Sequence, residues 1–186
     1  MKIVVLDGME QKNPLSNPLM RSLEDNNTDY SYFKLMDMDI KPCRSCGVCG
    51  LVTPGKCSIK DDIEIIMSAV AKSTMLIFLT PIRFGGYSSE LKKIIDRFML
   101  LGLPLYIVRK GHLLHPSRYN TIKWLFVIGL SENKSLVQEE SLRKLVKNNA
   151  LNMRVSQKAL IFKPTEDGLS IKTRIDYILE GVGMNA

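Results

Sequence analysis

The sequence predicts an α/β fold: a doubly wound parallel sheet of five strands, in the order 2-1-3-4-5, with helices on both faces. Short and nearly continuous apolar runs alternate with segments of helical period along the chain. Such runs are typical of parallel strands that are buried on both faces. Five strands and about five helices fit the doubly wound arrangement. The 186 residues are expected to form one domain, residues 1–186, long enough to bury a core.

The strands are expected at five apolar runs: Lys2–Leu6, Tyr30–Leu35, Met75–Thr80, Trp124–Gly129 and Ala159–Phe162. Helices are expected where apolar residues recur at helical spacing, at Ile63–Val70, Leu91–Phe98, Leu142–Val146 and Ile171–Val182. A further helix is expected to begin with Asn17 as its N-cap, because proline follows at Pro18. Asp61 and Glu64 form an acidic version of the capping box, which predicts that the next helix begins soon after Cys57.

Composition narrows the classes of function. Apolar residues make up 45% and charged residues 24% of the chain, as in ordinary globular proteins. The net charge of +7 is spread along the chain and only 7% of residues are aromatic, which argues against a nucleic-acid partner. The longest apolar stretch, Phe98–Val108, is too short to span a bilayer, so no membrane association is expected. The first residues resemble a strand rather than a signal peptide, which favours the cytoplasm.

All four cysteines lie in one cysteine-rich loop, at about residues 41–60, with the spacing C-x2-C-x2-C-x7-C: Cys43, Cys46, Cys49 and Cys57. In the cytosol, clustered thiols favour metal or redox roles over disulfides. Zinc sites usually use two cysteine pairs with a longer spacer, and a redox C-x-x-C pair would leave two thiols unexplained. The spacing resembles iron–sulfur ligation and favours a [4Fe–4S] cluster. Zinc and unmetallated thiols remain alternatives.

Residues 50–57 read G-x-x-x-x-G-K-C, one residue short of a phosphate-binding P-loop. Cys57 stands where a hydroxyl would have to bind Mg²⁺, and a thiol is a poor ligand for that cation. Nucleotide hydrolysis is therefore not expected. Gly55 is instead expected to supply a turn that brings Cys57 back to the other thiols.

Two loops follow strands at the edge where doubly wound sheets bind ligands. The loop after the first strand, with Gly8, Asn13, Ser16 and Asn17, precedes a helix N-terminus that suits a phosphate. The loop after the third strand places two glycines beside Phe84 and Tyr87, so a ring could approach the backbone. The alternative is a plain turn capped by Ser88 or Ser89. Because the cysteine-rich loop follows the second strand, it is expected at the same edge.

Two segments carry a family resemblance: Cys43–Asp62, with the cysteine motif and the start of the next helix, and Thr80–Arg97, with a ligand loop and its helix. Together they resemble the iron–sulfur flavoprotein branch of the flavodoxin-like NAD(P)H-dependent FMN reductase superfamily. The match covers most of residues 1–100. The chain departs from the family pattern at Met9 and Glu10, where a phosphate-binding signature is usual, and at Arg83, where an aromatic residue is common.

The resemblance implies FMN at the carboxyl edge of the sheet and a [4Fe–4S] cluster on the four cysteines. It assigns the phosphate to the first loop, with Gly8, Asn13, Ser16, Asn17 and Leu19, and the flavin ring to Thr80, Pro81, Ile82, Arg83, Phe84 and Gly85. Gly129 and Leu130 would close the other side of the ring. The resemblance also implies a homodimer or homotetramer, with a cluster close to the flavin of a neighbouring subunit.

The leading functional hypothesis is an oxidoreductase that passes electrons between FMN, a [4Fe–4S] cluster and a partner. That partner is expected to be a ferredoxin-like protein or a small molecule of the nicotinamide or quinone type. One alternative is an NAD(P)H-dependent FMN or quinone reductase with zinc or free thiols in the loop. Another is a non-enzymatic flavodoxin-fold binding protein.

Overall fold

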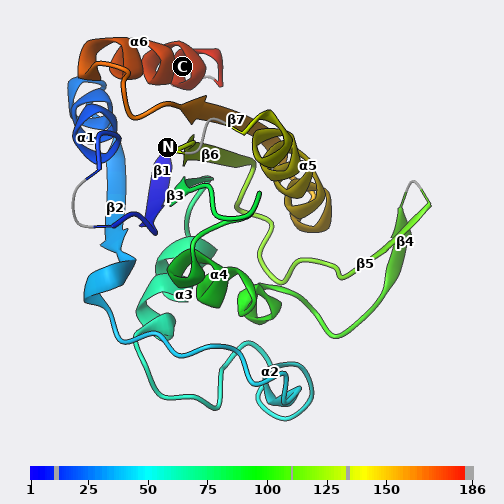
Figure 1. The fold of residues 1–186 in the computed structure, drawn as a ribbon. Helices are drawn as coiled ribbons and strands as arrows, with labels where there is room; N and C mark the ends of the chain where they lie inside the picture. The colour runs from blue at the N-terminus through cyan, green and yellow to red at the C-terminus, as the bar shows by residue number, and fades with distance from the viewer. Residues whose placement is uncertain (11–12, 110, 133–134, 183–186) are drawn as a thin grey trace.

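A five-stranded parallel sheet forms the centre of the computed structural model, which describes residues 1–10, 13–109, 111–132 and 135–182 (Figure 1). The strands are β1 (Lys2–Asp7), β2 (Asp29–Lys34), β3 (Met75–Pro81), β6 (Trp124–Leu130) and β7 (Ser156–Phe162). Their order is β2-β1-β3-β6-β7, and every neighbouring pair is parallel. The predicted order 2-1-3-4-5 is therefore confirmed, and each predicted strand is present.

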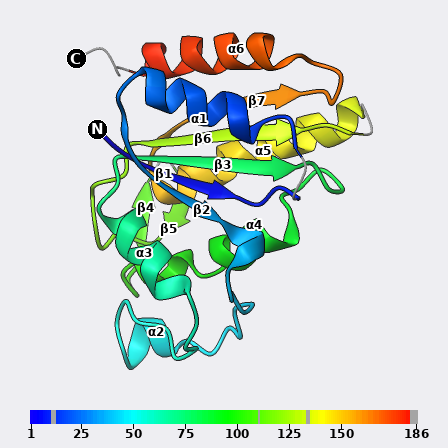
Figure 2. The same cartoon turned by 90° about the vertical axis from the view of Figure 1, so that its left-hand side faces the viewer.

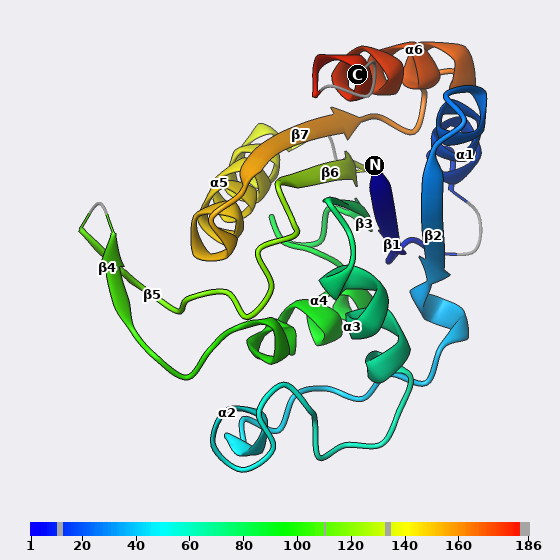
Figure 3. The same cartoon turned by 180° about the vertical axis from the view of Figure 1, so that it is seen from behind.

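Helices cover both faces of this sheet (Figures 1 and 3). Helices α1 (Ser16–Asp25) and α6 (Gly168–Gly181) pack on one face, and α3 (Ile63–Ala71), α4 (Ser89–Ile95) and α5 (Leu136–Met153) on the other. Successive strand residues enter opposite cores: Val4 faces α3 and α4, whereas Ile3 and Val5 face α1 and α6. Because both faces are buried, the strands need apolar residues at nearly every position.

The start of α1 differs from the sequence prediction. Asn17 is not the N-cap, because α1 already begins at Ser16. Asn13 satisfies the first free amides instead: its Oδ1 accepts hydrogen bonds from the Leu15 and Ser16 N–H groups at 3.0 and 2.9 Å. An asparagine four residues earlier thus performs the capping that was assigned to Asn17.

The predicted capping box at α3 is also wrong. Helix α3 begins at Ile63, and the N-cap residue Asp62 makes no side-chain cap. The Asp61 carboxylate accepts a hydrogen bond from the buried Arg97 at 2.5 Å. A charged partner from another part of the chain has therefore drawn Asp61 away from the reciprocal bonding with Glu64 that a capping box requires.

Several short elements lie outside the sheet and its helices. An antiparallel hairpin of β4 (Ile107–Arg109) and β5 (His112–Leu114) projects from the domain, in a region where the sequence predicted no element (Figures 1 and 3). The cysteine-rich loop contains α2 (Val48–Leu51), and the 3-10 turns η1 (Leu35–Asp37) and η2 (Phe98–Leu101) follow β2 and α4. Among the helices of the described ranges, none has the length and apolar character needed to cross a membrane.

Candidate functional site

Three loops meet at the carboxyl edge of the sheet, where the strand arrowheads lie in Figure 2. They follow β1, β3 and β6, which are neighbours in the sheet. The Gly8 N–H donates to the Leu79 carbonyl at 2.9 Å, and the Ile82 N–H donates to the Leu130 carbonyl at 2.9 Å. These bonds hold the start of each loop against the neighbouring strand, so the loops lie together at the edge where the ligand is predicted.

The loop after β1 is organised around a buried carboxylate. Asp7 is 2% exposed and accepts hydrogen bonds from the Met9 N–H at 2.8 Å, the Ser16 hydroxyl at 2.9 Å and the Tyr32 hydroxyl. Burial, together with the bond to Asp7, raises the pKa of Tyr32, so this phenol stays protonated and donating. A cavity of about 560 Å³ opens here, lined by Asp7, Asn13, Pro14, Ser16, Asn17, Tyr32 and Lys34. Leu19, in contrast, is fully buried in the core under α1.

The loop after β3 holds an aromatic ring away from the protein. Phe84 and Gly85 have φ values of +51° and +78°, and the amides and carbonyls of Arg83 and Gly86 pair across them. Two central residues with positive φ are the pattern of a tight hairpin turn, in which a phenylalanine is strained. Phe84 nevertheless occupies it and is 98% exposed. Strained backbone of this kind clusters at functional sites, which makes Phe84 a candidate contact residue at this edge.

The rest of this loop is built into the core. The Thr80 hydroxyl accepts the Ser88 N–H at 2.9 Å, and Ser88 caps α4 through the Leu91 N–H, as predicted for Ser88 or Ser89. Pro81 and Ile82 are buried, as are Gly85, Gly129 and Leu130. A Cβ on Gly129 would lie 2.9 Å from Leu142 Cδ2, so this glycine lets α5 approach the sheet. Of the residues assigned to the flavin ring, Arg83 and Phe84 are the most accessible.

Arg83 joins the three edge loops. Its Nη2 lies 2.5 Å from Glu10 Oε1 in the loop after β1, and its Nη1 lies 2.7 Å from Glu132 Oε2 in the loop after β6. The hydrogen bond with Glu10 and the nearby charge of Glu132 raise the pKa of Arg83 against the opposing effect of burial. Glu10 stands where the family usually has part of its phosphate-binding signature, and here its carboxylate points toward Arg83. All three side chains are more than a third exposed, so each pair adds little to stability.

The cysteine-rich loop gathers four free thiols. Cys43 and Cys46 are exposed, whereas Cys49 and Cys57 are half-buried. The predicted turn at Gly55 is present: its φ is +78°, and its N–H donates to the Cys49 carbonyl at 2.9 Å. A hydrogen bond from the Val48 backbone, then one from Ser58, lowers the pKa of Cys46. Burial, then the charges of the other three thiols, raises the pKa of Cys49.

Both ends of this loop are tied together at the protein core. The Asp39 N–H donates to Asp62 Oδ2 at 2.8 Å, and the Lys41 N–H donates to Asp61 Oδ2 at 2.8 Å. Arg97 then pairs with the same Asp61 oxygen, and both side chains are covered, 1% and 0% exposed. Sequence reasoning did not find this ion pair, because its partners lie 36 residues apart.

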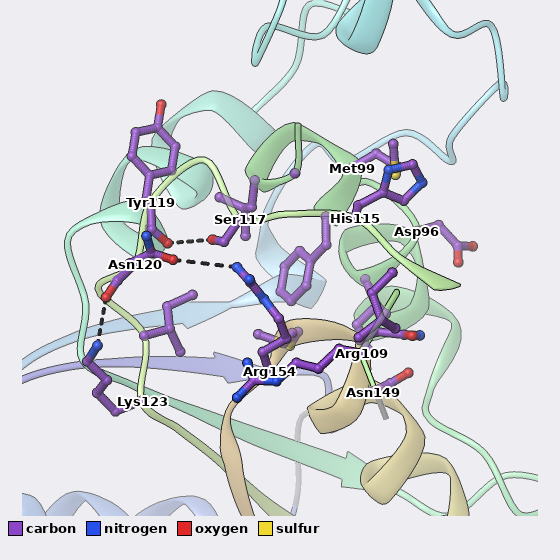
Figure 4. Close-up of a pocket in the computed structure, with 18 of the residues that line it drawn as sticks. Asp96, Met99, Arg109, His115, Ser117, Tyr119, Asn120, Lys123, Asn149 and Arg154 are labelled. Atoms are coloured by element: carbon purple, nitrogen blue, oxygen red, sulfur yellow. Dashed lines mark hydrogen bonds between the residues drawn. The ribbon is translucent and has the colours of Figure 1, made fainter. Parts of the chain in front are cut away.

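A second cavity, of about 520 Å³, lies away from the ligand edge (Figure 4). It is enclosed by the end of α4, by η2, by the β5 hairpin strand and the chain after it, and by the end of α5. Its polar lining includes Arg109, His115, Lys123 and Arg154. Lys123 directly precedes β6, so this part of the cavity lies at the amino end of the strands, opposite the loops of the predicted flavin site. The sequence contained no motif that pointed to it.

Residues 1–164 match the family described as NADPH-dependent FMN reductase. The chain belongs to this family. It is 28% identical over 101 residues to an iron–sulfur flavoprotein of Methanocaldococcus jannaschii, a match that covers 52% of this chain and 51% of that protein. An iron–sulfur flavoprotein of Archaeoglobus fulgidus is 26% identical over 112 residues, 59% of this chain and 54% of that protein. The chain thus spans about half the length of the curated relatives it matches.

The fold of this FMN reductase family member is shared with solved structures. An NAD(P)H:quinone oxidoreductase from Methanothermobacter marburgensis superposes with a TM-score of 0.67, covering 100% of this chain and 98% of that one. The sequences are 13% identical, so the likeness concerns the fold alone. It agrees with the flavodoxin-like topology expected from the sequence.

The ligand edge of this FMN reductase family member has groups that suit the family's flavin. The cavity at α1 offers a lysine, the Ser16 hydroxyl and the Asn13 and Asn17 amides to a phosphate, although the Asp7 carboxylate also lines it. Phe84 offers an apolar ring on the same edge. Phosphate, ribityl chain and flavin ring require this combination of polar and aromatic groups, so the residues present fit FMN.

The cysteine-rich loop fits an iron–sulfur cluster by the chemistry of its donors. It supplies four thiols without a disulfide, beside a buried guanidinium with unpartnered N–H groups. Thiolate ligands with N–H donors to their sulfur atoms are typical of such clusters. The thiols are not closed around one point: within residues 1–10, 13–109, 111–132 and 135–182, no three Cys, His, Asp or Glu side chains are grouped to hold a metal ion.

Proposed function

We propose that this chain is an FMN-dependent oxidoreductase whose cysteine-rich loop carries a [4Fe–4S] cluster on Cys43, Cys46, Cys49 and Cys57. Its electrons would pass between the flavin and a ferredoxin-like protein, a nicotinamide or a quinone. One observation carries the proposal: four free thiols share one loop, anchored by a buried ion pair, on the fold of the FMN reductase family. Relatives named iron–sulfur flavoproteins support the same assignment.

On the flavin side, the residues of the ligand edge bind and orient. Lys34, Ser16 and Asn17 would hold the phosphate at the start of α1, where the positive end of the helix dipole favours an anion. Phe84 would contact the flavin ring, which would account for an exposed aromatic side chain in a strained turn. Arg83 would keep the three loops in place by bridging Glu10 and Glu132.

On the cluster side, the thiols act as ligands. Hydrogen bonds from the Val48 backbone and from Ser58 lower the pKa of Cys46, which favours its thiolate as a ligand. Bound FMN supplies two-electron exchange with organic molecules, and a bound cluster supplies one-electron exchange. No general base is needed for either.

Anaerobic purification with quantitation of FMN and iron tests this function. We expect flavin absorption, a broad iron–sulfur shoulder and about four irons per chain. Cys49→Ser should lose the iron and keep the flavin, while Lys60→Ala, which removes an exposed side chain from the same loop, should keep both. Protein that contains neither iron nor flavin would refute the proposal.

A second candidate is an FMN or quinone reductase of the same family with zinc or free thiols in the loop. The exposure of Cys43 and Cys46 favours the free-thiol version of this candidate, because reactive thiols are accessible to solvent. One zinc and no iron per chain, with flavin bound, would select this candidate. A colourless protein that does not bind FMN would select a binding protein without redox activity.

We also propose that the chain forms a homodimer or homotetramer through the β4–β5 hairpin. Val108 and Leu113 pair across the two strands and are 76% and 65% exposed. A two-stranded hairpin with exposed apolar side chains is barely stable alone, so packing on a second copy would stabilise it. Light scattering after size exclusion measures the mass directly and tests this assembly.

A further inference from the structure

The second cavity (Figure 4) has a floor of apolar side chains that are not fully covered. Its volume of about 520 Å³ falls within the range of sites for small organic molecules, about 300–1,000 Å³. Phe78 and Leu114 form buried parts of its wall. Five further apolar residues line it while they remain only partly buried at the edge of the core: Ile95, Phe98, Leu101, Ile122 and Met153. Apolar surface that is left open inside a cavity favours a ligand with an apolar body.

The charges that line this cavity are mainly positive. Arg109, Lys123 and Arg154 contribute three cations, against the single carboxylate of Asp96. Asp96 already forms an ion pair with Lys92 of α4. Within the described ranges of the chain, none of the three cations forms an ion pair with a carboxylate. An excess of positive charge in a cavity attracts an anion.

Asn120 brings two of these cations together. Its carbonyl oxygen accepts a hydrogen bond from Lys123 Nζ at 2.9 Å, and its Oδ1 lies 3.5 Å from Arg154 Nη2 (Figure 4). Neither contact neutralises a charge, because both oxygen atoms belong to uncharged groups. Two cations that meet at one neutral residue can together hold one carboxylate.

Arg154 has a backbone conformation that favours glycine. It is the C-cap residue of α5, with φ +59° and ψ 42°, in the left-handed region. Glycine is usual where a helix ends in this conformation, because a side chain adds strain there. The Arg154 Nε is also buried and has no hydrogen-bond partner in the part of the chain that the structure describes. Strain and a missing acceptor on one residue of the cavity wall point to a ligand that binds its guanidinium.

A purely structural role for Arg154 explains less. A cation at the C-terminus of α5 interacts favourably with the helix dipole. An exposed side chain fulfils that role, which requires neither a buried Nε nor a strained backbone. The two roles can be separated, because glycine at this position would relieve the strain and remove the cation. Stability and ligand binding should then change in opposite directions.

We propose that the second cavity is a binding site for an amphipathic carboxylate, a small organic acid whose apolar body lies on the cavity floor. Its carboxylate would accept hydrogen bonds from Arg154 and Lys123, because a guanidinium matches the two oxygens of a carboxylate. Lys123 precedes β6, whereas the loops of the predicted flavin site follow the strands. The proposed site is therefore separate from the flavin edge and does not depend on the proposed function.

Isothermal titration calorimetry with phenylbutyrate and phenylbutanol tests this site. The two probes share an apolar body, and only phenylbutyrate carries a carboxylate. Both are titrated into protein with FMN in excess, so that they cannot occupy a flavin site. The variants are Arg154→Gly and Lys123→Met. Lys147→Met is the matched control, because it removes an exposed cation of α5 that does not line the cavity.

We expect one phenylbutyrate per chain, with phenylbutanol at least about tenfold weaker, since a hydrogen bond to a charged group is lost. Arg154→Gly should weaken phenylbutyrate by a similar factor, leave phenylbutanol unchanged and have a Tm at or above that of the wild type. Lys123→Met should weaken phenylbutyrate less, and Lys147→Met should match the wild type.

Three results would overturn the inference. The first is equal affinity for the two probes, or no binding of either one. The second is phenylbutyrate affinity that survives in Arg154→Gly, or that falls as much in Lys147→Met. The third is an Arg154→Gly protein with a lower Tm, because Arg154 would then serve the fold.

Discussion

Replacing Asp61 with alanine should destabilise the protein far more than the removal of an ordinary surface carboxylate. Asp61 accepts hydrogen bonds from Arg97, from the Lys41 N–H and from the Ile63 N–H, at 2.5, 2.8 and 3.3 Å. Its side chain is 0% exposed and that of Arg97 is 1% exposed. Asp61→Ala leaves the guanidinium buried and uncompensated, and breaking such a pair typically costs about 3–5 kcal/mol.

For a chain of this size, a loss of about 3–5 kcal/mol in the free energy of unfolding lowers Tm by roughly 6–20 °C, at about 2–4 °C per kcal/mol. The double variant Asp61→Asn with Arg97→Met removes both charges and should recover most of the loss, because it leaves no buried ion without a partner. Glu140→Ala is the control: Glu140 pairs with Lys144 at 2.8 Å, but both side chains are more than 60% exposed. Because water screens both charges, that pair should contribute little to stability.

Chemical denaturation of the four proteins, followed by circular dichroism at neutral pH, measures these differences. A double-mutant cycle, completed with the single variants Asp61→Asn and Arg97→Met, then isolates the coupling between Asp61 and Arg97. The reasoning fails if Asp61→Ala costs less than about 1 kcal/mol, which is the range of exposed pairs. It also fails if the double variant is as unstable as Asp61→Ala, since the buried charge would then not be the cause.

Three further predictions follow from the packing and the charges. Burial acts to raise the pKa of Asp61, but the hydrogen bonds from Arg97 and from the Lys41 amide outweigh it and lower the pKa. The stabilisation of the fold by ionised Asp61 is therefore complete above the pKa of an unfolded aspartate, about 3.9, and is lost as the pH falls below that value. Urea midpoints measured down through pH 4 should fall more steeply in the wild type than in Asp61→Asn, and parallel curves would contradict this. Gly129→Ala should cost about 1–3 kcal/mol in thermal denaturation, because its Cβ would lie 2.9 Å from Leu142 Cδ2; an unchanged Tm would show that α5 can shift freely. Val108→Lys with Leu113→Glu keeps a cross-strand pair in the hairpin and should reduce the mass seen by light scattering, whereas an unchanged oligomer would place the interface elsewhere.

The sheet could be predicted from sequence because parallel strands are buried on both faces. Leu76, Ile77, Phe78 and Leu79 alternate between the two cores, and all are 0% exposed, so each must be apolar. This requirement is local and leaves a continuous signal in the sequence. Strand bounds were accordingly predicted to within a few residues in every case.

Helix starts and short strands were harder, because distant residues decide them. Asp61 has the sequence pattern of a cap, yet Arg97, in the turn after α4, offers it a stronger partner. The hairpin strands are three residues each and mix exposed apolar with polar side chains, so no period identifies them. Their stability depends on contacts that local patterns do not encode.

The candidate site, too, could be predicted only in part from the sequence. Four cysteines within fifteen residues are visible in the sequence, and the structure places them as free thiols in one loop. The charges that surround the two candidate sites are not visible, because they come from other parts of the chain. Arg83 reaches Glu10 and Glu132 across 73 and 49 residues, and Arg97 reaches Asp61 across 36.

The placement of the two candidate sites along α4 bears on how electrons would move between them. Phe84 lies in the loop that leads into α4 at Ser89, whereas Arg97 and the cysteine-rich loop lie beyond its last residue, Ile95. Seven helical residues rise about 10 Å, so the two sites are at opposite ends of this helix rather than side by side on the edge after β2. The loop packs instead against η2, which α2 contacts, and against the segment after β5, where a Cβ on Gly55 would lie 3.1 Å from Arg118 Nε. Under the proposed function, electrons would either cross this separation within one chain or pass from the cluster of one copy to the flavin of another.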